Sequence, residues 1–189
     1  VTREDLPDGG SEHFRRCVES VRARLPECSI EVLVPDFGGR HESIDRVAGA
    51  AIDVFNHNVE TVPRLYPRVR PQADFERSIG VLERARTVRP SLATKSGLML
   101  GLGEREPEIE ALLLRLHKAG CSIVTLGQYL QPSSRQVPVE RYVEPREFDR
   151  WAQRAREIGF LEVAAGPLVR SSYRAGVCWE EVRRVDRGE

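Results

Sequence analysis

The stretch Ile52-Asp-Val-Phe-Asn-His-Asn-Val-Glu-Thr-Val62 joins an apolar strand to a run of polar side chains. Its first half has the β-branched and aromatic character of a buried strand. Because side chains alternate across a strand, Asn56, Asn58 and Glu60 are predicted to share one face. Burying a polar group without a partner costs about 1–3 kcal/mol. This face is therefore expected either to line a polar cavity or to lie at a solvated strand end.

Similar apolar segments lie before and after this stretch, and amphipathic helical segments separate them. We predict strands over residues 30–37, 52–60, 95–102, 122–130 and 161–169. Ser11 and Asp74 are predicted helix N-caps, while Gly120 and Gly159 are predicted to end helices. The segment that contains Pro63, Pro67 and Pro71 is predicted to be too rich in proline for regular structure.

Strand and helix alternate at the spacing of βα units, which predicts a parallel sheet with right-handed crossovers. The chain has 189 residues and few predicted strands, whereas a closed eight-stranded barrel needs about 250 residues. The predicted fold class is therefore α/β, an open or partial barrel. Sites in such folds form at the carboxyl ends of the strands. The polar residues predicted at those ends are Asp36, Asn56, Asn58, Glu60, Glu104, Gln128, Tyr129 and Arg170.

Composition narrows the possible functions. The chain has 29 Lys and Arg residues against 29 Asp and Glu, so nothing indicates a nucleic-acid-binding or anionic-membrane surface. We expect a soluble protein, because no apolar run is long enough to span a bilayer and no leader pattern is found. The four cysteines are scattered without a Cys-x-x-Cys pair, which argues against a disulfide framework and a self-contained metal site. Since the chain starts at Val1 in the middle of a strand-to-loop pattern, we expect it to be the later part of a longer protein.

The other polar segments leave alternatives open. The turn at Gly101 and Gly103 lacks both the dinucleotide and the phosphate-loop patterns, so it is either a tight turn beside a ligand or simply a tight turn. Gln128 ends its strand with an amide that suits a polar ligand or a turn. We interpret His57 as a structural histidine pointing towards the helices. Lys95 is of the type that forms Schiff bases, but it lies at the amino end of its strand, away from the predicted site.

The segment Arg170-Ser-Ser-Tyr173 follows the last predicted strand with hydroxyl groups and one cation. The Gly-x-Ser-x-Gly elbow of a serine nucleophile is absent. A serine that binds a metal cluster through its oxygen is rare but chemically possible.

Several segments, in order, resemble the lipoyl synthase family of radical S-adenosylmethionine (radical SAM) enzymes, and the resemblance extends over nearly all of residues 1–176. They include Asp5-Leu-Pro-Asp-Gly-Gly10, Asp53-Val-Phe-Asn-His-Asn-Val-Glu-Thr-Val-Pro-Arg64, Thr94-Lys-Ser-Gly-Leu-Met-Leu-Gly-Leu-Gly-Glu104, Thr125-Leu-Gly-Gln-Tyr-Leu-Gln-Pro-Ser133 and Gly166-Pro-Leu-Val-Arg-Ser-Ser-Tyr173. The resemblance implies a partial (β/α)6 TIM-like barrel of the radical SAM type, with parallel strands and outer helices, incomplete at the N-terminus. The barrel core would cover residues 1–176 and a charged tail residues 177–189.

The resemblance also implies the chemistry. In this family one [4Fe–4S] cluster, held by Cys-x3-Cys-x2-Cys, cleaves S-adenosylmethionine to a 5′-deoxyadenosyl radical. An auxiliary [4Fe–4S] cluster, held by Cys-x4-Cys-x5-Cys, is consumed as the donor of two sulfur atoms. These atoms enter C6 and C8 of a protein-bound octanoyl-lysine and make the lipoyl cofactor.

Site residues follow from the resemblance residue by residue. Ser171 is implied as the unusual fourth ligand of the auxiliary cluster. The residues implied in or near the S-adenosylmethionine pocket are Asn56, Asn58, Glu60, Gly101, Gly103 and Gln128. The implied partners are octanoylated lipoyl-domain proteins, namely E2 subunits of 2-oxoacid dehydrogenases and the H protein of glycine cleavage, with flavodoxin or ferredoxin as electron donor. The implied location is the cytoplasm, or the mitochondrion in a eukaryote.

The chain also departs from the family. Both cysteine motifs are missing, and Cys17, Cys28, Cys121 and Cys178 do not fall at cluster spacing. We therefore expect this chain alone to be inactive and to have no catalytic residue of its own. A second hypothesis is a cluster-less, non-catalytic homologue or fragment that binds S-adenosylmethionine or lipoyl-domain proteins. A third is an ordinary partial-barrel enzyme, such as an aldolase that uses Lys95.

Overall fold

The sheet consists of parallel strands that follow one another in the order of the sequence. The computed structural model describes residue 3 and residues 5–172, so the predicted tail over residues 177–189 lies outside the described residues. The sheet has five strands in the order β1-β2-β3-β4-β5, and every neighbouring pair is parallel. The strands are β1 (Glu31–Leu33), β2 (Val54–Asn56), β3 (Ala93–Leu100), β4 (Ile123–Gln128) and β5 (Glu162–Gly166). All lie within the predicted segments or within two residues of them, which confirms the α/β prediction.

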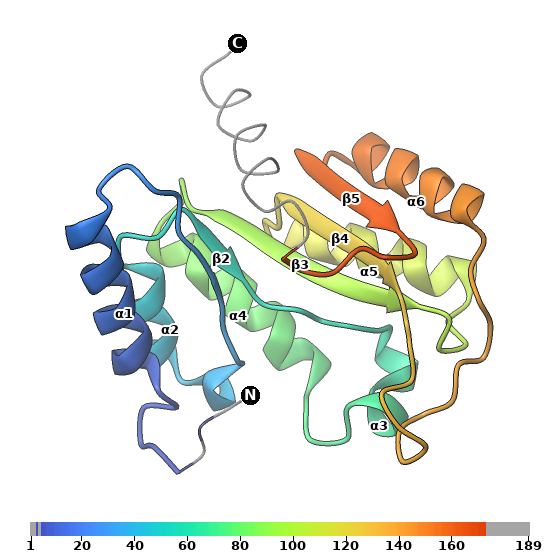
Figure 1. Ribbon diagram of the computed structural model, residues 1–189, viewed down its shortest axis with the longest axis horizontal. Helices are drawn as coiled ribbons and strands as arrows, with labels where there is room; N and C mark the ends of the chain where they lie inside the picture. The colour runs from blue at the N-terminus through green and yellow to red at the C-terminus, as the bar shows by residue number, and fades with distance from the viewer. Residues whose placement is uncertain (1–2, 4, 173–189) are drawn as a thin grey trace.

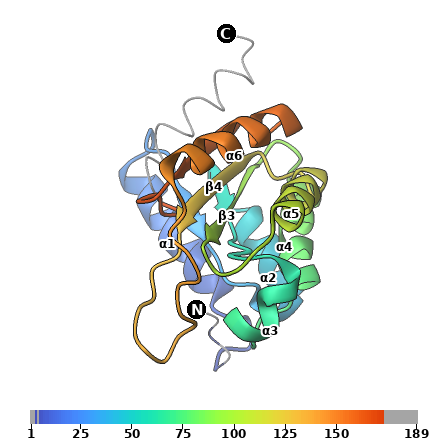
Figure 2. The same cartoon turned by 90° about the vertical axis from the view of Figure 1, so that its right-hand side faces the viewer.

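The helices cover one side of this sheet (Figures 1 and 2). Because each strand pairs with the next along the chain, right-handed crossovers place successive helices on the same face. The opposite face is left free to curve around an interior, as in a partial barrel. The helices are α1 (Ser11–Arg24), α2 (His41–Ala48), α3 (Tyr66–Val69), α4 (Phe75–Val88), α5 (Glu106–Lys118) and α6 (Pro145–Ile158), with short 3-10 helices at η1 (Phe37–Gly39) and η2 (Pro63–Leu65).

Helix ends follow the predicted capping chemistry with one exception. Asp74 caps α4 by accepting the backbone N–H of Arg77, and Gly159 ends α6 in the left-handed conformation at φ 115°. The prediction of Ser11 as an N-cap is wrong, because Ser11 is the first helical residue. The N-cap residue is Gly10, and the side-chain hydrogen bond comes from Asp8, whose carboxylate accepts the backbone N–H of Glu12 at 2.7 Å.

The proline-rich segment is regular, contrary to the prediction. Pro63 opens η2 and Pro67 lies in the first turn of α3. Proline is tolerated at these positions because the first N–H groups of a helix have no partner within the helix. Leu65 and Tyr66 between them are buried, so packing against the core supports the two short helices.

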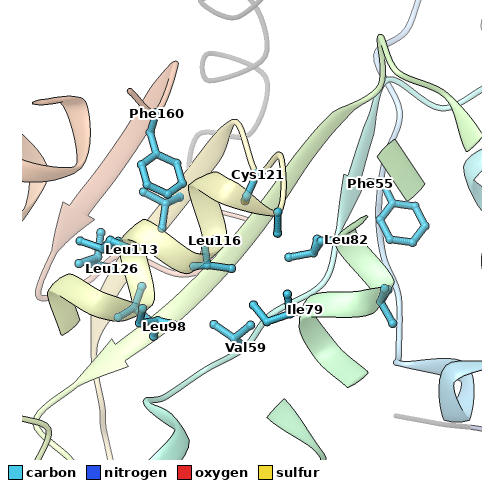
Figure 3. Packing of buried hydrophobic residues seen from close by; sticks show 14 of the residues in the cluster. Phe55, Val59, Ile79, Leu82, Leu98, Leu113, Leu116, Cys121, Leu126 and Phe160 are labelled. Carbon is cyan, nitrogen blue, oxygen red and sulfur yellow. The ribbon is translucent and has the colours of Figure 1, made fainter. Parts of the chain in front are cut away.

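The main hydrophobic core lies between the sheet and its helices. Figure 3 shows Phe55 of β2 near Leu82 of α4, and Leu116 of α5 near the middle of the sheet. On the other face of the sheet, Val54, Ala93 and Ile123 form a separate small cluster. This face of the sheet is therefore apolar at Val54, Ala93 and Ile123, near the beginnings of β2, β3 and β4.

Candidate functional site

A cavity of about 680 Å³ opens on the interior side of the sheet, near the carboxyl ends of β3 and β4. Its volume falls in the range of small-molecule sites, about 300–1,000 Å³. Polar groups from distant parts of the chain meet here. The residues that matter below are Asn58, Glu60, Gly97, Gln128 and Ser171, all of which line this first cavity. The structure thus brings together Asn58, Glu60, Gln128 and Ser171, four of the residues singled out from the sequence.

The predicted strand over residues 52–60 ends early. Regular pairing of β2 stops at Asn56, and Glu60 returns to β3 through an isolated bridge to Leu98. Glu60 has a φ of 65°, in the left-handed region. Asn58 and Glu60 still line the same cavity, as the alternation predicted. Asn56 lies outside that lining set and is buried, and its amide donates to Glu31 at 2.7 Å.

Buried polar atoms without a partner concentrate in this segment. Within the described part of the chain, Asn56 Oδ1, His57 Nε2, Asn58 Oδ1 and Thr61 Oγ1 have no hydrogen-bond partner. Such atoms are uncommon in folded proteins and point to a missing ligand or water. Of these four residues only Asn58 lines the first cavity. Its Oδ1 is an acceptor, so a ligand there is expected to offer a donor or a positive charge.

A second cavity, of about 1100 Å³, lies on the other side of the same segment and shares Asn58 and Glu60 with the first. His57 lines it. The imidazole Nδ1 lies 2.9 Å from the carbonyl of Val34, so it must carry the proton and donate. Burial lowers the pKa of His57 to about 4. The predicted hydrogen bond of His57 is confirmed, and His57 also lines the second cavity.

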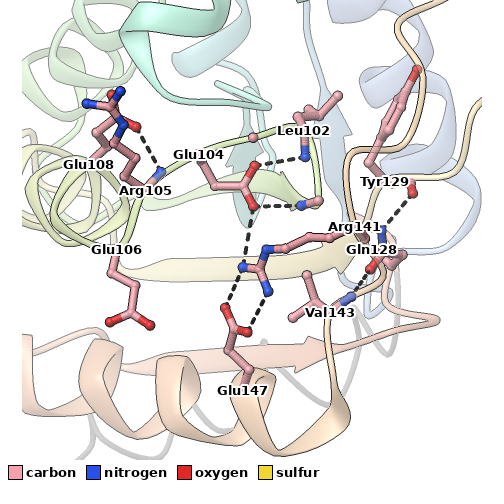
Figure 4. Close-up of polar contacts among 12 residues, drawn as sticks. Leu102, Glu104, Arg105, Glu106, Glu108, Gln128, Tyr129, Arg141, Val143 and Glu147 are labelled. Atoms are coloured by element: carbon pink, nitrogen blue, oxygen red, sulfur yellow. Dashed lines mark hydrogen bonds and ion pairs between the residues drawn. The ribbon is translucent and has the colours of Figure 1, made fainter.

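The glycine turn after β3 is held by a residue that sequence reasoning did not single out for a role. Figure 4 shows the carboxylate of Glu104 turned back onto the turn. It accepts the N–H groups of Gly101 at 2.6 Å and Leu102 at 2.9 Å. The sequence signal was a glutamate that directly follows two closely spaced glycines, Gly101 and Gly103. In the structure both glycines have φ near 100°, a conformation that favours glycine. Neither glycine is among the lining residues of the first cavity.

Gln128 lines the first cavity, but its amide is already committed to the backbone. Its Nε2 donates to the carbonyls of Tyr129 and Arg141, at 2.9 and 3.1 Å. Its Oε1 accepts the N–H of Val143 at 2.8 Å. Gln128 therefore ties β4 to the segment before α6, as Figure 4 shows.

Ser171 reaches the first cavity because the chain crosses closely over β4. A Cβ atom placed on Gly127 would lie 2.3 Å from the carbonyl oxygen of Val169, so only glycine allows this approach. Arg170 then donates to the carbonyls of Gln128 and Val169. Tyr173 of the same motif lies outside the described residues.

The interior below the cavity contains a buried ion pair. The ammonium of Lys95 is fully buried and lies 3.0 Å from both carboxylate oxygens of Glu31. The same carboxylate accepts the amide of Asn56. Lys95 is thus engaged at the amino end of β3, as its sequence position predicted, and offers no free amine to a carbonyl substrate.

The described residues do not fit an iron–sulfur cluster by themselves. Cys17 is exposed, Cys28 is half-buried and Cys121 is buried, and none of the three lines either cavity. Burial raises the pKa of the Cys121 thiol to about 12. No group of three or more His, Cys, Asp or Glu side chains suited to a metal ion is found among residues 3 and 5–172. In the same part of the chain, no helix is long and apolar enough to cross a membrane.

The fold and the sequence together define the class of protein. The sequence model described as "Radical SAM superfamily" matches residues 1–116, and the chain belongs to that superfamily. A solved structure of methylornithine synthase superposes with a TM-score of 0.63 over 80% of this chain and 44% of that one. At 15% sequence identity this likeness shows the fold alone, and it confirms the predicted TIM-like partial barrel.

Within the superfamily, the chain is most usefully compared with curated lipoyl synthases. It is 54% identical to the lipoyl synthase of Methylococcus capsulatus over 176 residues, which are 93% of this chain and 55% of that protein. It is also 54% identical to the lipoyl synthase of Chlorobium limicola, over 93% of this chain and 60% of that protein. The predicted resemblance to lipoyl synthases is confirmed. The chain spans little more than half the length of these relatives.

Proposed function

We propose that this chain is the part of a lipoyl synthase that holds S-adenosylmethionine and contributes one ligand to an auxiliary cluster. The observation that supports the proposal is the shared cavity: Asn58 and Glu60 from the β2–β3 connection and Ser171 from the end of β5 line the same space. A sulfur-inserting enzyme of this class needs its cofactor and its sulfur source close to one substrate chain. The similarity to lipoyl synthases supplies the substrate, an octanoyl group on a lipoyl-domain protein.

The hydrogen-bond acceptors of the first cavity support S-adenosylmethionine as its ligand. Asn58 Oδ1 is a buried acceptor without a partner, and Glu60 adds a carboxylate. Together they match a ligand that carries hydroxyl groups, an ammonium group and a positively charged sulfur. When bound next to a reduced cluster, this cofactor supplies the oxidising radical. The chain's own groups would bind and orient it, while the apolar walls at Leu98 and Val137 limit access of water.

The cluster cysteines are proposed to lie in the part of the relatives' length that this chain does not match. Ser171 would add its hydroxyl oxygen to the auxiliary [4Fe–4S] cluster, and a second cluster would serve S-adenosylmethionine. Gly101 and Gly103, which lie in the turn held by Glu104, would shape the wall near the cofactor and not touch it. Asn56 would act from below, through Glu31.

Replacing Ser171 by alanine in the intact protein tests the proposal. We expect reductive cleavage of S-adenosylmethionine to remain within a few-fold of wild type, whereas insertion of sulfur falls by at least about a hundredfold, the usual cost of losing a ligand or its support. Ser172→Ala is the matched control, because Ser172 is exposed and does not line the cavity. Equal loss of both activities in Ser171→Ala would contradict the ligand assignment.

A second candidate function is a cluster-less protein that binds S-adenosylmethionine or lipoyl-domain proteins without radical chemistry. It is favoured by the placement of Cys17, Cys28 and Cys121, which lie away from both cavities. Anaerobic reconstitution of the intact protein with iron and sulfide separates the two. Iron–sulfur absorbance supports the synthase, and its absence supports the binding protein.

A further inference from the structure

The polar side chains of the first cavity are carried by a strained piece of backbone. Glu60 lies at φ 65°, a conformation that costs a non-glycine residue about 1–2 kcal/mol. Its N–H donates to the carbonyl of Gly97 at 2.9 Å, and its carbonyl accepts the N–H of Met99 at 2.8 Å. Such a conformation persists only where the surroundings hold it. The Ser96 hydroxyl of β3 also accepts the N–H of Val59 at 3.2 Å. The turn over residues 58–60 therefore needs contacts beyond these three bonds to β3.

Arg70 supplies those contacts along the whole turn. Its Nη1 donates to the carbonyls of Asn58 and Val59, each at 3.1 Å. Its Nε lies 3.6 Å from the carboxylate of Glu60. One guanidinium thus contacts three consecutive residues, and its planar set of donors makes this possible.

Tyr66 fixes both the turn and Arg70. Its hydroxyl donates to the carbonyl of Val59 at 2.8 Å and accepts a hydrogen bond from Arg70 at 3.2 Å. The guanidinium carbon lies 5.4 Å from the centre of the Tyr66 ring, within cation–π range. The Tyr66 ring packs edge-on against the ring of Phe75, the first residue of α4, with the ring centres 5.5 Å apart. This contact fixes the position of the ring and so of its hydroxyl.

Arg70 approaches the turn from the second cavity, which it lines together with His57. The lining set of the first cavity contains its neighbours Val69 and Pro71 without Arg70. Its guanidinium therefore acts on the first cavity through the backbone of residues 58–60. Neutral hydrophobic contacts could not replace it, since it meets two carbonyls, a carboxylate and the hydroxyl of Tyr66.

We propose that Arg70 and Tyr66 are positioning residues that clamp the turn over residues 58–60 and so aim Asn58 and Glu60 into the first cavity. The identity of the ligand rests on the function proposed above, whereas the clamp itself does not. A ligand that meets a preformed turn avoids the cost of ordering it. Loss of the clamp is therefore expected to weaken binding more than it weakens the fold.

Hydrogen exchange in the intact protein tests the clamp without any ligand. In Arg70→Met we expect the amides of residues 57–61 to exchange at least about tenfold faster than in wild type, the equivalent of one charge-assisted hydrogen bond. Arg89→Met is the matched control, because Arg89 also donates to two backbone carbonyls, those of Ala50 and Ile52, but away from the site. It should leave exchange over residues 57–61 unchanged. Unchanged exchange in Arg70→Met overturns the inference.

Binding of S-adenosylmethionine, measured by equilibrium dialysis, gives the second readout. Each variant is measured at a temperature equally far below its own melting temperature, so that differences in folding do not contribute. We expect Arg70→Met to weaken binding by about tenfold or more, Tyr66→Phe by a smaller factor in the same direction, and Arg89→Met not at all. If wild type binds and Arg70→Met binds equally well, the clamp is wrong. If wild type does not bind, the proposed ligand is wrong, and the exchange experiment still decides the clamp.

Discussion

The buried ion pair beneath the cavity gives the sharpest prediction about stability. Lys95 is fully buried and has only the Glu31 carboxylate as a charged partner among the described residues. Removing one member of a buried pair leaves the other charge uncompensated, at a cost of about 3–5 kcal/mol. The Glu31 side chain is 18% exposed and keeps the amide of Asn56. We therefore expect Lys95→Met to cost about 3 kcal/mol, near the lower end of that range.

Urea unfolding of the intact protein, followed by circular dichroism at pH 7, measures this loss. A cost of about 3 kcal/mol corresponds to a fall in melting temperature of roughly 6–12 °C for a domain of this size. Arg84→Met is the control, because its pair with Asp45 is one-third exposed and should be worth about 1 kcal/mol or less.

The double variant Glu31→Gln/Lys95→Met removes both charges while an amide carbonyl remains for Asn56. It should lose less stability than Lys95→Met alone, because no uncompensated charge is left. A loss below about 1 kcal/mol in Lys95→Met would show that solvent already reaches the pair. A double variant that loses as much as the sum of the two single variants would refute the coupling.

Three further outcomes are expected. Gly97→Ala should weaken binding of S-adenosylmethionine, measured by dialysis, by about tenfold or more. The added Cβ would lie 2.8 Å from Thr125 Oγ1 and 3.0 Å from Asn58 Oδ1. Gly80→Ala in α4, whose Cβ would meet no atom within 4 Å, should leave binding unchanged. Because His57 has a folded pKa of about 4 against an ordinary value of 6.5, the unfolded chain binds more protons between these values. Stability should thus fall by about 1.4 kcal/mol per pH unit as the pH drops through that window, and His57→Gln should remove this part of the slope in urea unfolding curves. In the native protein at pH 8, mass spectrometry should find Cys121 unmodified by iodoacetamide while exposed Cys17 reacts; rapid labelling of Cys121 would contradict its burial.

The order and type of the main elements could be predicted because they depend on periodicity. Apolar segments bounded by glycine, proline and capping residues gave all five strands, and the βα spacing gave the parallel sheet. The exact ends could not be predicted. The β2 ladder stops at Asn56. The backbone then turns at Glu60 into a conformation that is uncommon for residues other than glycine and asparagine, and nothing in the pattern predicts it.

The errors have local causes. The density of prolines predicts an irregular segment, but Pro63 and Pro67 each lie in a first helical turn, where the proline's missing N–H would have no partner within the helix. Serine is common at N-caps, which favours Ser11 in the sequence, but in the structure the carboxylate of Asp8 accepts the N–H groups of Gly10 and Glu12. The frequency of a residue type at helix N-caps does not show which of two neighbouring side chains is placed to accept the free N–H groups.

The site was predicted in part. The rule that sites form at the carboxyl ends of strands was enough to select Asn58, Glu60 and Gln128, and the resemblance selected Ser171. The sequence could not show that the Gln128 amide is used by the backbone, since its partners Arg141 and Val143 come from a later segment. The contacts of Glu104 and Arg70 also depend on tertiary structure, because each acts on a neighbouring turn and not on the cavity itself.

The missing side chain of Gly127 has a consequence for how a serine can enter the cavity. The carbonyl of Val169 occupies the space where a methyl group would stand, so the segment leading to Ser171 passes within van der Waals distance of β4. Even alanine at 127 would displace this crossing outward and withdraw the Ser171 hydroxyl from the cavity wall. The reach of the proposed oxygen ligand thus depends on the absence of a side chain at Gly127, forty-four positions earlier in the chain.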